Sequence, residues 1–237
     1  MKAMIVSDFL SIKGYILSQS LVGIAVGLFV SASMSNVYMV TSMLAAMIPF
    51  SLIFTVLAYD ERNGWQEFRL TLPLSRTQVI TGRYGSYLVF TGIGLGVAAI
   101  ALGIVVALAF LFPTLTINKP IGNLLVDFSW QTLAFSLAAT LAPMTILASI
   151  ILPLVSRFGL TTAVRFVPLA LVFGAFVIAP PLLNISGEPP VFITDFVAWI
   201  QTDTGALMAS AIALAVAATI YVLSCALSAK LYAKREM

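Results

Sequence analysis

The stretch from Gly14 to Tyr59, GYILSQSLVGIAVGLFVSASMSNVYMVTSMLAAMIPFSLIFTVLAY, contains no charged residue. It divides at Ser35 and Asn36 into two apolar runs, 14–33 and 37–59. Each run can cross a bilayer, because a membrane-spanning helix needs about 20 apolar residues. The stretch therefore predicts two membrane-spanning helices joined by a turn of a few residues.

The rest of the chain repeats this pattern. Of its 237 residues, 61% are hydrophobic and 9% are charged, and the mean hydropathy is +1.08, whereas soluble domains carry about 25% charged residues. Further apolar runs cover 84–112, 128–155, 166–183 and 205–229. We expect an all-α membrane protein with six transmembrane helices, in which residues 1–237 form a single transmembrane domain.

Residues 1–13, MKAMIVSDFLSIK, mix apolar and polar side chains at helical spacing. This spacing predicts a short amphipathic helix in the membrane interface. A signal peptide is the alternative for the apolar run that follows. We favour a retained first span, because Asp8 lies in the supposed basic region and another apolar run follows almost at once.

The basic residues indicate the orientation. If the N-terminus is cytoplasmic, all of the 12 Lys and Arg residues except Lys119 fall in inner segments. Inner loops of membrane proteins are enriched in Lys and Arg. We therefore expect both termini in the cytoplasm and an even number of spans.

Several function classes lack their required residues. No span has an unambiguous charge near its midpoint, since Asp127 falls at the outer edge of 128–155, and this disfavours an autonomous ion-driven transporter. There is no Gly-Lys dipeptide for a Walker A loop. The absence of histidine excludes a Ser-His protease, and the single cysteine, Cys225, allows no internal disulfide. If ATP drives this chain, the ATPase is a separate chain.

The inner segment 60–83, DERNGWQEFRLTLPLSRTQVITGR, is the longest charged stretch, with seven of the chain's 21 charges (12 basic plus 9 acidic). Residues 61–70 can form a short helix with Trp65 and Phe68 on one face. Ser75 to Gln78 reads as an S-x-x-Q capping box that opens the next helix. Trp65 fits two roles equally well: an anchor for a partner protein or a headgroup-level aromatic residue.

The run YDERNGWQEFRLTLPLSRTQVITGRY, residues 59–84, resembles the hallmark of small ABC-2-type transporter permeases. It has an acidic pair, a Gly-Trp, an LP-S-R turn and a basic residue entering the next span. Six spans, an N-terminal elbow helix and the chain length are similar as well. The resemblance implies a non-catalytic permease subunit of an ATP-binding-cassette exporter in a bacterial plasma membrane. It also implies a second permease, usually a copy of itself, and two cytoplasmic ATPase subunits that hold the ATP and Mg²⁺. No cofactor, metal or nucleic acid is expected on this chain.

The resemblance also implies roles for particular residues. The segment after the second span would hold a cytoplasmic coupling helix, and its ATPase-coupling residues would be Glu61, Arg62, Trp65, Glu67, Phe68, Leu72, Pro73, Ser75 and Arg76. The turn 156–165 would be a second, smaller contact. Residues 184–204 would form an outer re-entrant or interfacial segment, in which 191–201 places several aromatic and apolar side chains on one helical side.

Two glycine pairs, Gly23 with Gly27 and Gly92 with Gly96, have the G-x-x-x-G spacing that permits close helix approach. Packing within one subunit and packing between subunits both fit this spacing. The resemblance assigns the first pair to a permease dimer interface.

The substrate is not identifiable from the sequence. An amphipathic peptide, a lipid-like molecule or an apolar drug would suit a mostly apolar path. The polar residues that would line the path, or bond between helices, are Gln19, Thr41, Gln131, Ser136 and Thr140. The alternative function is a six-span substrate-binding subunit of an energy-coupling-factor vitamin importer, which the long polar segment 60–83 disfavours.

Overall fold

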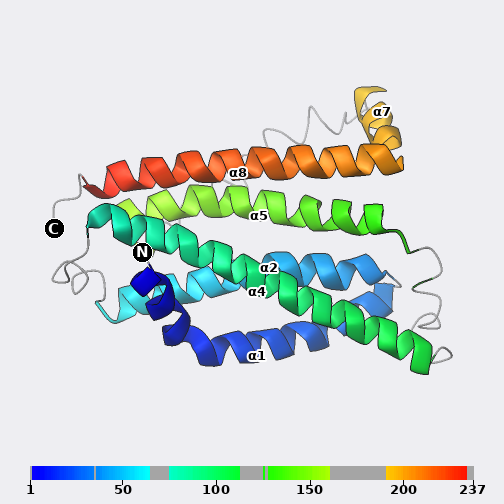
Figure 1. Cartoon of the computed structure of the whole chain (residues 1–237), viewed down its shortest axis with the longest axis horizontal. Helices are drawn as coiled ribbons and strands as arrows, with labels where there is room; N and C mark the ends of the chain where they lie inside the picture. Colours follow the sequence, from blue (N-terminus) through cyan, green and yellow to red (C-terminus); the bar gives the residue numbers. More distant parts are fainter. Residues whose placement is uncertain are drawn as a thin grey trace, which may run out of the picture.

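The computed structural model describes residues 2–34, 36–64, 75–112, 125, 128–160 and 191–233. These residues form α1 (Lys2–Met34), α2 (Val37–Arg62), α4 (Arg76–Leu111), α5 (Trp130–Phe158), α7 (Val191–Ile200) and α8 (Asp203–Ala233). All except α7 are long and apolar enough to cross a membrane, and they lie side by side in Figure 1. The expected all-α membrane fold is confirmed. The predicted span 166–183 lies outside the described residues, so the six-span count stays a prediction.

The first helix joins two segments that were expected to be separate. The interfacial helix 1–13 and the span 14–33 form one continuous helix, α1, whose N-terminal part lies at an angle to the rest in Figure 1. Met4 and Ile12 are buried in the bundle, whereas Phe9 and Leu10 are exposed. That the N-terminal part of α1 lies in the membrane interface, with its exposed side chains toward lipid, stays a prediction.

The centre of the bundle is α2. It packs against α1, α4 and α5, and Val40 and Leu52 on its buried sides are fully covered. Pro49 is tolerated inside this helix, as prolines are in membrane spans where neighbouring helices supply compensating contacts.

Polar residues before the apolar runs start the helices. Ser75 forms the predicted capping box: its Oγ accepts from the Gln78 backbone N–H at 3.2 Å, and Gln78 Oε1 accepts from the Ser75 N–H at 3.2 Å. Side chains of Asn36 and Ser129 accept backbone N–H groups at the starts of α2 and α5. Because Ser75 caps the helix, α4 begins at Arg76, as the capping box predicts, and the apolar run expected from residue 84 forms its later part.

The helices α5 and α8 run parallel to each other. At one end, Gln131 of α5 faces Asp203 at the start of α8 across a cavity, and further along, Ser224 of α8 bonds to the carbonyl of Ser149. The chain therefore leaves α5 at one end of the bundle and enters α8 at the other (Figure 1). The predicted span 166–183 would carry the chain across the membrane from the end of α5 to the start of α8.

Candidate functional site

One end of the bundle gathers the first residues of α1 and α4 and the last residues of α2, α5 and α8 (Figure 1). We call it the basic end, because Lys13, Arg62, Arg83, Arg157 and Lys230 lie toward it.

Three charged residues near the basic end lie on buried helix faces. Asp8 is 1% exposed, Asp60 is 6% exposed and Arg83 is 7% exposed. Buried apolar side chains flank each of them at helical spacing: Met4 and Ile12 lie four residues on either side of Asp8. The amphipathic pattern that buries the apolar residues therefore buries the charges with them.

The guanidinium of Arg83 joins the other two helices. Its Nη1 lies 3.1 Å from Asp8 Oδ2 of α1, and its Nη2 donates to Asp60 Oδ2 of α2. Ser86, one turn further along α4, donates from Oγ to Asp8 Oδ2 at 2.7 Å. We call Asp8, Asp60, Arg83 and Ser86 the charged junction.

Burying this junction is energetically costly. Removing charges from water costs several kcal/mol per ion, and pairing repays that cost only with good hydrogen-bonding geometry. The arginine fork supplies such geometry because it presents several N–H donors in one plane. Ionisable groups inside membrane bundles are usually functional, and this marks the junction as a candidate site.

A cavity of about 50 Å³ adjoins the junction. Asp60 and Arg83 line it together with Tyr84, Ser156 of α5 and Tyr232 of α8. The rest of its wall is apolar, with Leu57, Leu152 and Val155 among the lining residues.

A second contact ties the exposed end of α2 to the end of α5. The backbone N–H of Leu160 donates to Glu61 Oε2 at 2.7 Å. Gly159 ends α5 with φ of +83°, a conformation that glycine adopts without strain. The start of segment 60–83 and the turn 156–165 therefore meet at the basic end.

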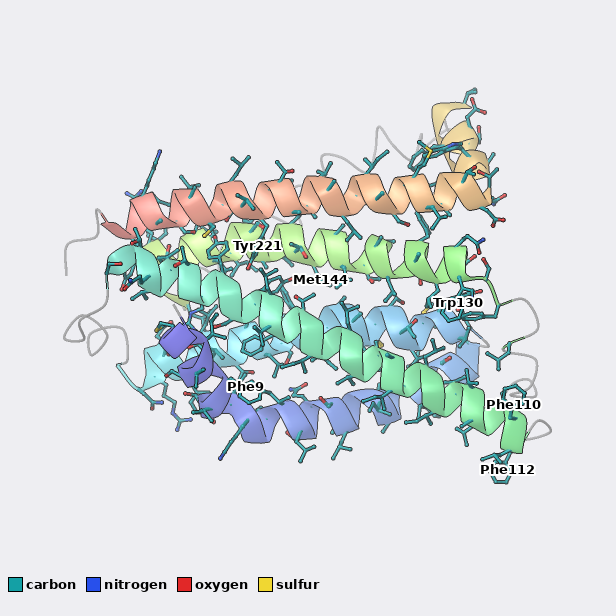
Figure 2. The ribbon with its side chains drawn as sticks, in the orientation of Figure 1. Phe9, Phe110, Phe112, Trp130, Met144 and Tyr221 are labelled. Atoms are coloured by element: carbon teal, nitrogen blue, oxygen red, sulfur yellow. The ribbon has the colours of Figure 1, made fainter. Side chains whose placement is uncertain are left out.

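A buried network of hydroxyl groups holds α4 to α8. Tyr84 Oη lies 2.7 Å from both Ser224 Oγ and Ser228 Oγ, and Tyr221 Oη donates to the carbonyl of Tyr84 at 2.7 Å. Figure 2 shows Tyr221 reaching from α8 toward α4. Ser224 extends the network to the carbonyl of Ser149 on α5.

The predicted ATPase-coupling residues are only partly described. Glu61 and Arg62 are exposed at the end of α2, Ser75 caps α4, and Arg76 is its first residue. Trp65, Glu67, Phe68, Leu72 and Pro73 lie outside the described residues. The coupling assignment stays a prediction.

The predicted path residues are spread over several helices. The hydroxyls of Thr41, Ser136 and Thr140 donate to carbonyls of their own helices, at 2.9, 2.9 and 3.0 Å. Gln19 is half-buried on α1. Gln131 lines a cavity of about 300 Å³ at the end opposite the basic end, between α5 and the α7–α8 turn. Their role in a path stays a prediction.

The first glycine pair packs within the chain. An added Cβ on Gly23 would lie 2.9 Å from Leu44 Cδ2, and one on Gly27 would lie 2.9 Å from Val40 Cγ2, both on α2. This contact matches the within-subunit reading of the G-x-x-x-G spacing, and the dimer interface stays a prediction.

Sequence reasoning missed the charged junction. It placed Asp8 on an interfacial helix and treated Arg83 as a basic residue at a span entrance. The available signal was the position of each charge on an apolar stripe, as with Val79, Ile80 and Tyr84 around Arg83. That signal becomes specific only when the three stripes are seen to face one another.

Long apolar helices around a buried charged junction define a polytopic helical membrane protein. The chain belongs to the ABC-2 family of transporter proteins, because the model of the family described as "ABC-2 family transporter protein" matches residues 3–233. Comparison with curated proteins finds no significant match. Family membership identifies the chain as a membrane permease of an ABC transporter, a class that is generally non-catalytic and that works with an ABC ATPase.

Proposed function

We propose that this chain is the permease subunit of an ATP-driven exporter and that its ATPase docks at the basic end. The docking surface comprises segment 60–83, centred on Trp65, and the turn 156–165. Two permease chains, usually copies of one another, and two ATPase subunits form the working transporter. Hydrolysis of ATP on the partner moves the substrate out of the cytoplasm.

The hydrogen bond from Leu160 to Glu61 is the observation that carries the docking site. It brings together two surfaces that are 99 residues apart in the sequence. Both fall in segments that the distribution of Lys and Arg assigns to the cytoplasm. A partner that binds one surface therefore contacts the other.

The lining of the bundle favours an amphipathic or apolar substrate. The predicted path residues are uncharged, and Gln131 contributes an amide to the 300 Å³ cavity at the opposite end. Asp203 is a carboxylate at the rim of that cavity. A peptide, lipid-like or drug-like molecule with few charges fits this lining better than an ion does.

The family match also bears on the alternative function. A vitamin-importer binding subunit docks its partners through helices in the membrane plane, whereas this chain has a polar segment of seven charges beyond α2. The ABC-2 match over residues 3–233 favours the exporter permease.

The double variant Trp65→Ala with Arg62→Ala tests the docking site. It should still insert and fold, because Arg62 is exposed and does not belong to the core of the bundle. We expect it to lose association with its ABC ATPase subunit, because hot-spot tryptophans and arginines carry much of an interface's binding energy. The measurement is co-purification of the two subunits and the ATP hydrolysis rate of the complex in liposomes.

Lys13→Gln is the matched control, since Lys13 is an exposed cation on α1 toward the same end. It should bind the ATPase as the wild type does. Normal ATPase binding and hydrolysis in the Trp65/Arg62 variant would refute the docking site.

A further inference from the structure

Segment 60–83 is closed at its base by an ion pair. Asp60 is buried at one end of the segment, and Arg83 is buried at the other, 23 residues later. Because the two side chains bond to each other, the last residues of α2 and the first two turns of α4 are held together. A force applied to the segment therefore reaches α2 and α4 together.

Asp8 adds a third helix to that point. Its Oδ2 accepts hydrogen bonds from Arg83 Nη1, at 3.1 Å, and from Ser86 Oγ, at 2.7 Å. Asp8 lies 75 residues before Arg83, and no part of segment 60–83 belongs to its helix. Hydrogen bonds between charged groups are about twice as strong as neutral ones, and the planar fork of arginine fixes the angle between its partners.

The arrangement of α1 explains why such a connection matters. C-terminal to Asp8, α1 exposes large apolar side chains that include Leu17, Leu21 and Phe29. Among the described residues, the exposed side of α1 therefore makes no contact that ties the helix to the rest of the bundle. The fully buried Asp8 and Ile12 hold its basic end. At the basic end, movement of α2 and α4 would otherwise reach α1 through apolar contacts such as those of Ile12 with the core, which slide more easily than directional bonds.

We propose that the charged junction is a rigid linkage through which movement of segment 60–83 turns α1, α2 and α4 as one unit, with Asp8 as the positioning residue on α1. The proposal rests on the proposed function, since it names how ATPase movement enters the bundle. It assigns a coupling role to a residue outside the docking segment. A linkage confined to segment 60–83 would need Asp60 and Arg83 but not Asp8.

The first experiment compares Asp8→Asn, Asp60→Asn and Arg83→Gln in complexes with the ATPase in liposomes. We expect each variant to keep ATPase association but to lose about tenfold in permease-stimulated ATP hydrolysis, within the usual range of coupling between sites. Arg83→Lys should fall between the wild type and Arg83→Gln, because lysine keeps the charge but lacks the fork. Lys13→Gln serves as the exposed-cation control and should hydrolyse ATP normally.

A neutral triple variant, Asp8→Asn with Asp60→Asn and Arg83→Gln, guards against simple misfolding. It leaves no buried charge unpaired, and replacing a whole buried ion network is often neutral for stability. Normal stimulation in this triple variant, or in Asp8→Asn alone, would overturn the proposal.

A distance measurement tests rigidity with the junction intact. Spin labels at Ser11→Cys of α1 and Thr77→Cys of α4, both exposed, are placed in a Cys225→Ser background. We expect the distance between them to stay the same with and without ATP. Small helix shifts are about 1–2 Å. A larger change in the distance between the two labels would overturn the rigid linkage. Failure of the wild-type chain to bind any ABC ATPase would instead refute the proposed function.

Discussion

Gly94, rather than the predicted pair Gly92 and Gly96, is the residue on which the close approach of α4 to α2 depends. An added Cβ on Gly94 would lie 2.7 Å from Pro49 Cδ and 3.1 Å from the carbonyl oxygen of Ala45. Gly92 and Gly96 are exposed, and no described atom lies within 4 Å of an added Cβ on either. Residues two apart on a helix face nearly opposite sides, so Gly92 and Gly96 do not face α2, and their role in packing between subunits stays a prediction.

Alanine substitutions at these glycines should separate the two faces. Gly94→Ala should lower the free energy of unfolding by about 1–3 kcal/mol, because backbone and proline atoms of α2 would have to move. Gly92→Ala and Gly96→Ala should be neutral or stabilise by up to about 1 kcal/mol, because alanine favours helix. Thermal unfolding in detergent measures all three. Equal stability of Gly94→Ala and Gly92→Ala would contradict the packing of α4 on α2.

At the scale of single elements, the turn between α7 and α8 depends on Gly205. Thr202 Oγ1 accepts from the Gly205 N–H at 3.1 Å, and Thr202 Oγ1 donates to the carbonyl of Trp199 at 2.7 Å. An added Cβ on Gly205 would lie 2.8 Å from the Trp199 carbonyl carbon. The end of α7 therefore packs directly on the start of α8.

Gly205→Ala should swing α7 away from α8 while the long helices stay intact. Trp199 is the reporter: with Trp65→Phe and Trp130→Phe present, its fluorescence should shift, and its quenching by acrylamide should change. Gly103→Ala is the control, because Gly103 is exposed on α4 and no described atom lies within 4 Å of an added Cβ there. Unchanged Trp199 fluorescence in Gly205→Ala would show that the turn tolerates a side chain.

The helices themselves were largely predictable from local pattern. Apolar run length located the described spans, and the Ser75–Gln78 spacing located the start of α4. The helices run beyond the apolar runs, because α4 starts at Arg76, where the capping box places it, and α8 continues to Ala233, beyond the expected end of the span at residue 229. Hydropathy measures burial in lipid, whereas a helix ends where its hydrogen bonds and caps end.

For the whole molecule, the described helices place the start of α1 and the end of α8 at the same end (Figure 1). The charge distribution predicts that this basic end faces the cytoplasm. In intact cells, a membrane-impermeant maleimide should label Thr132→Cys, which lies at the opposite end, and should not label Ser11→Cys. Both positions are exposed, and Cys225→Ser removes the native thiol. The reverse labelling pattern would overturn the orientation.

Exposed aromatic residues mark the opposite end as well. Figure 2 shows Phe110 and Phe112 at the tip of α4 and Trp130 at the start of α5. All three are exposed, as expected for aromatic residues near the membrane–water interface. The placement agrees with spans that begin and end at the two surfaces of one bilayer.

The sequence by itself determined the class of fold, the approximate spans and the family resemblance, because these depend on the length of apolar runs and on short local motifs. The tertiary structure decided which residues meet. It paired Asp8 and Asp60 with Arg83, joined Glu61 to Leu160 and selected Gly94 over Gly92. These contacts depend on how each helix is rotated about its axis and on which neighbour it faces. Hydropathy carries no information on either, because lipid and protein both accept an apolar side chain.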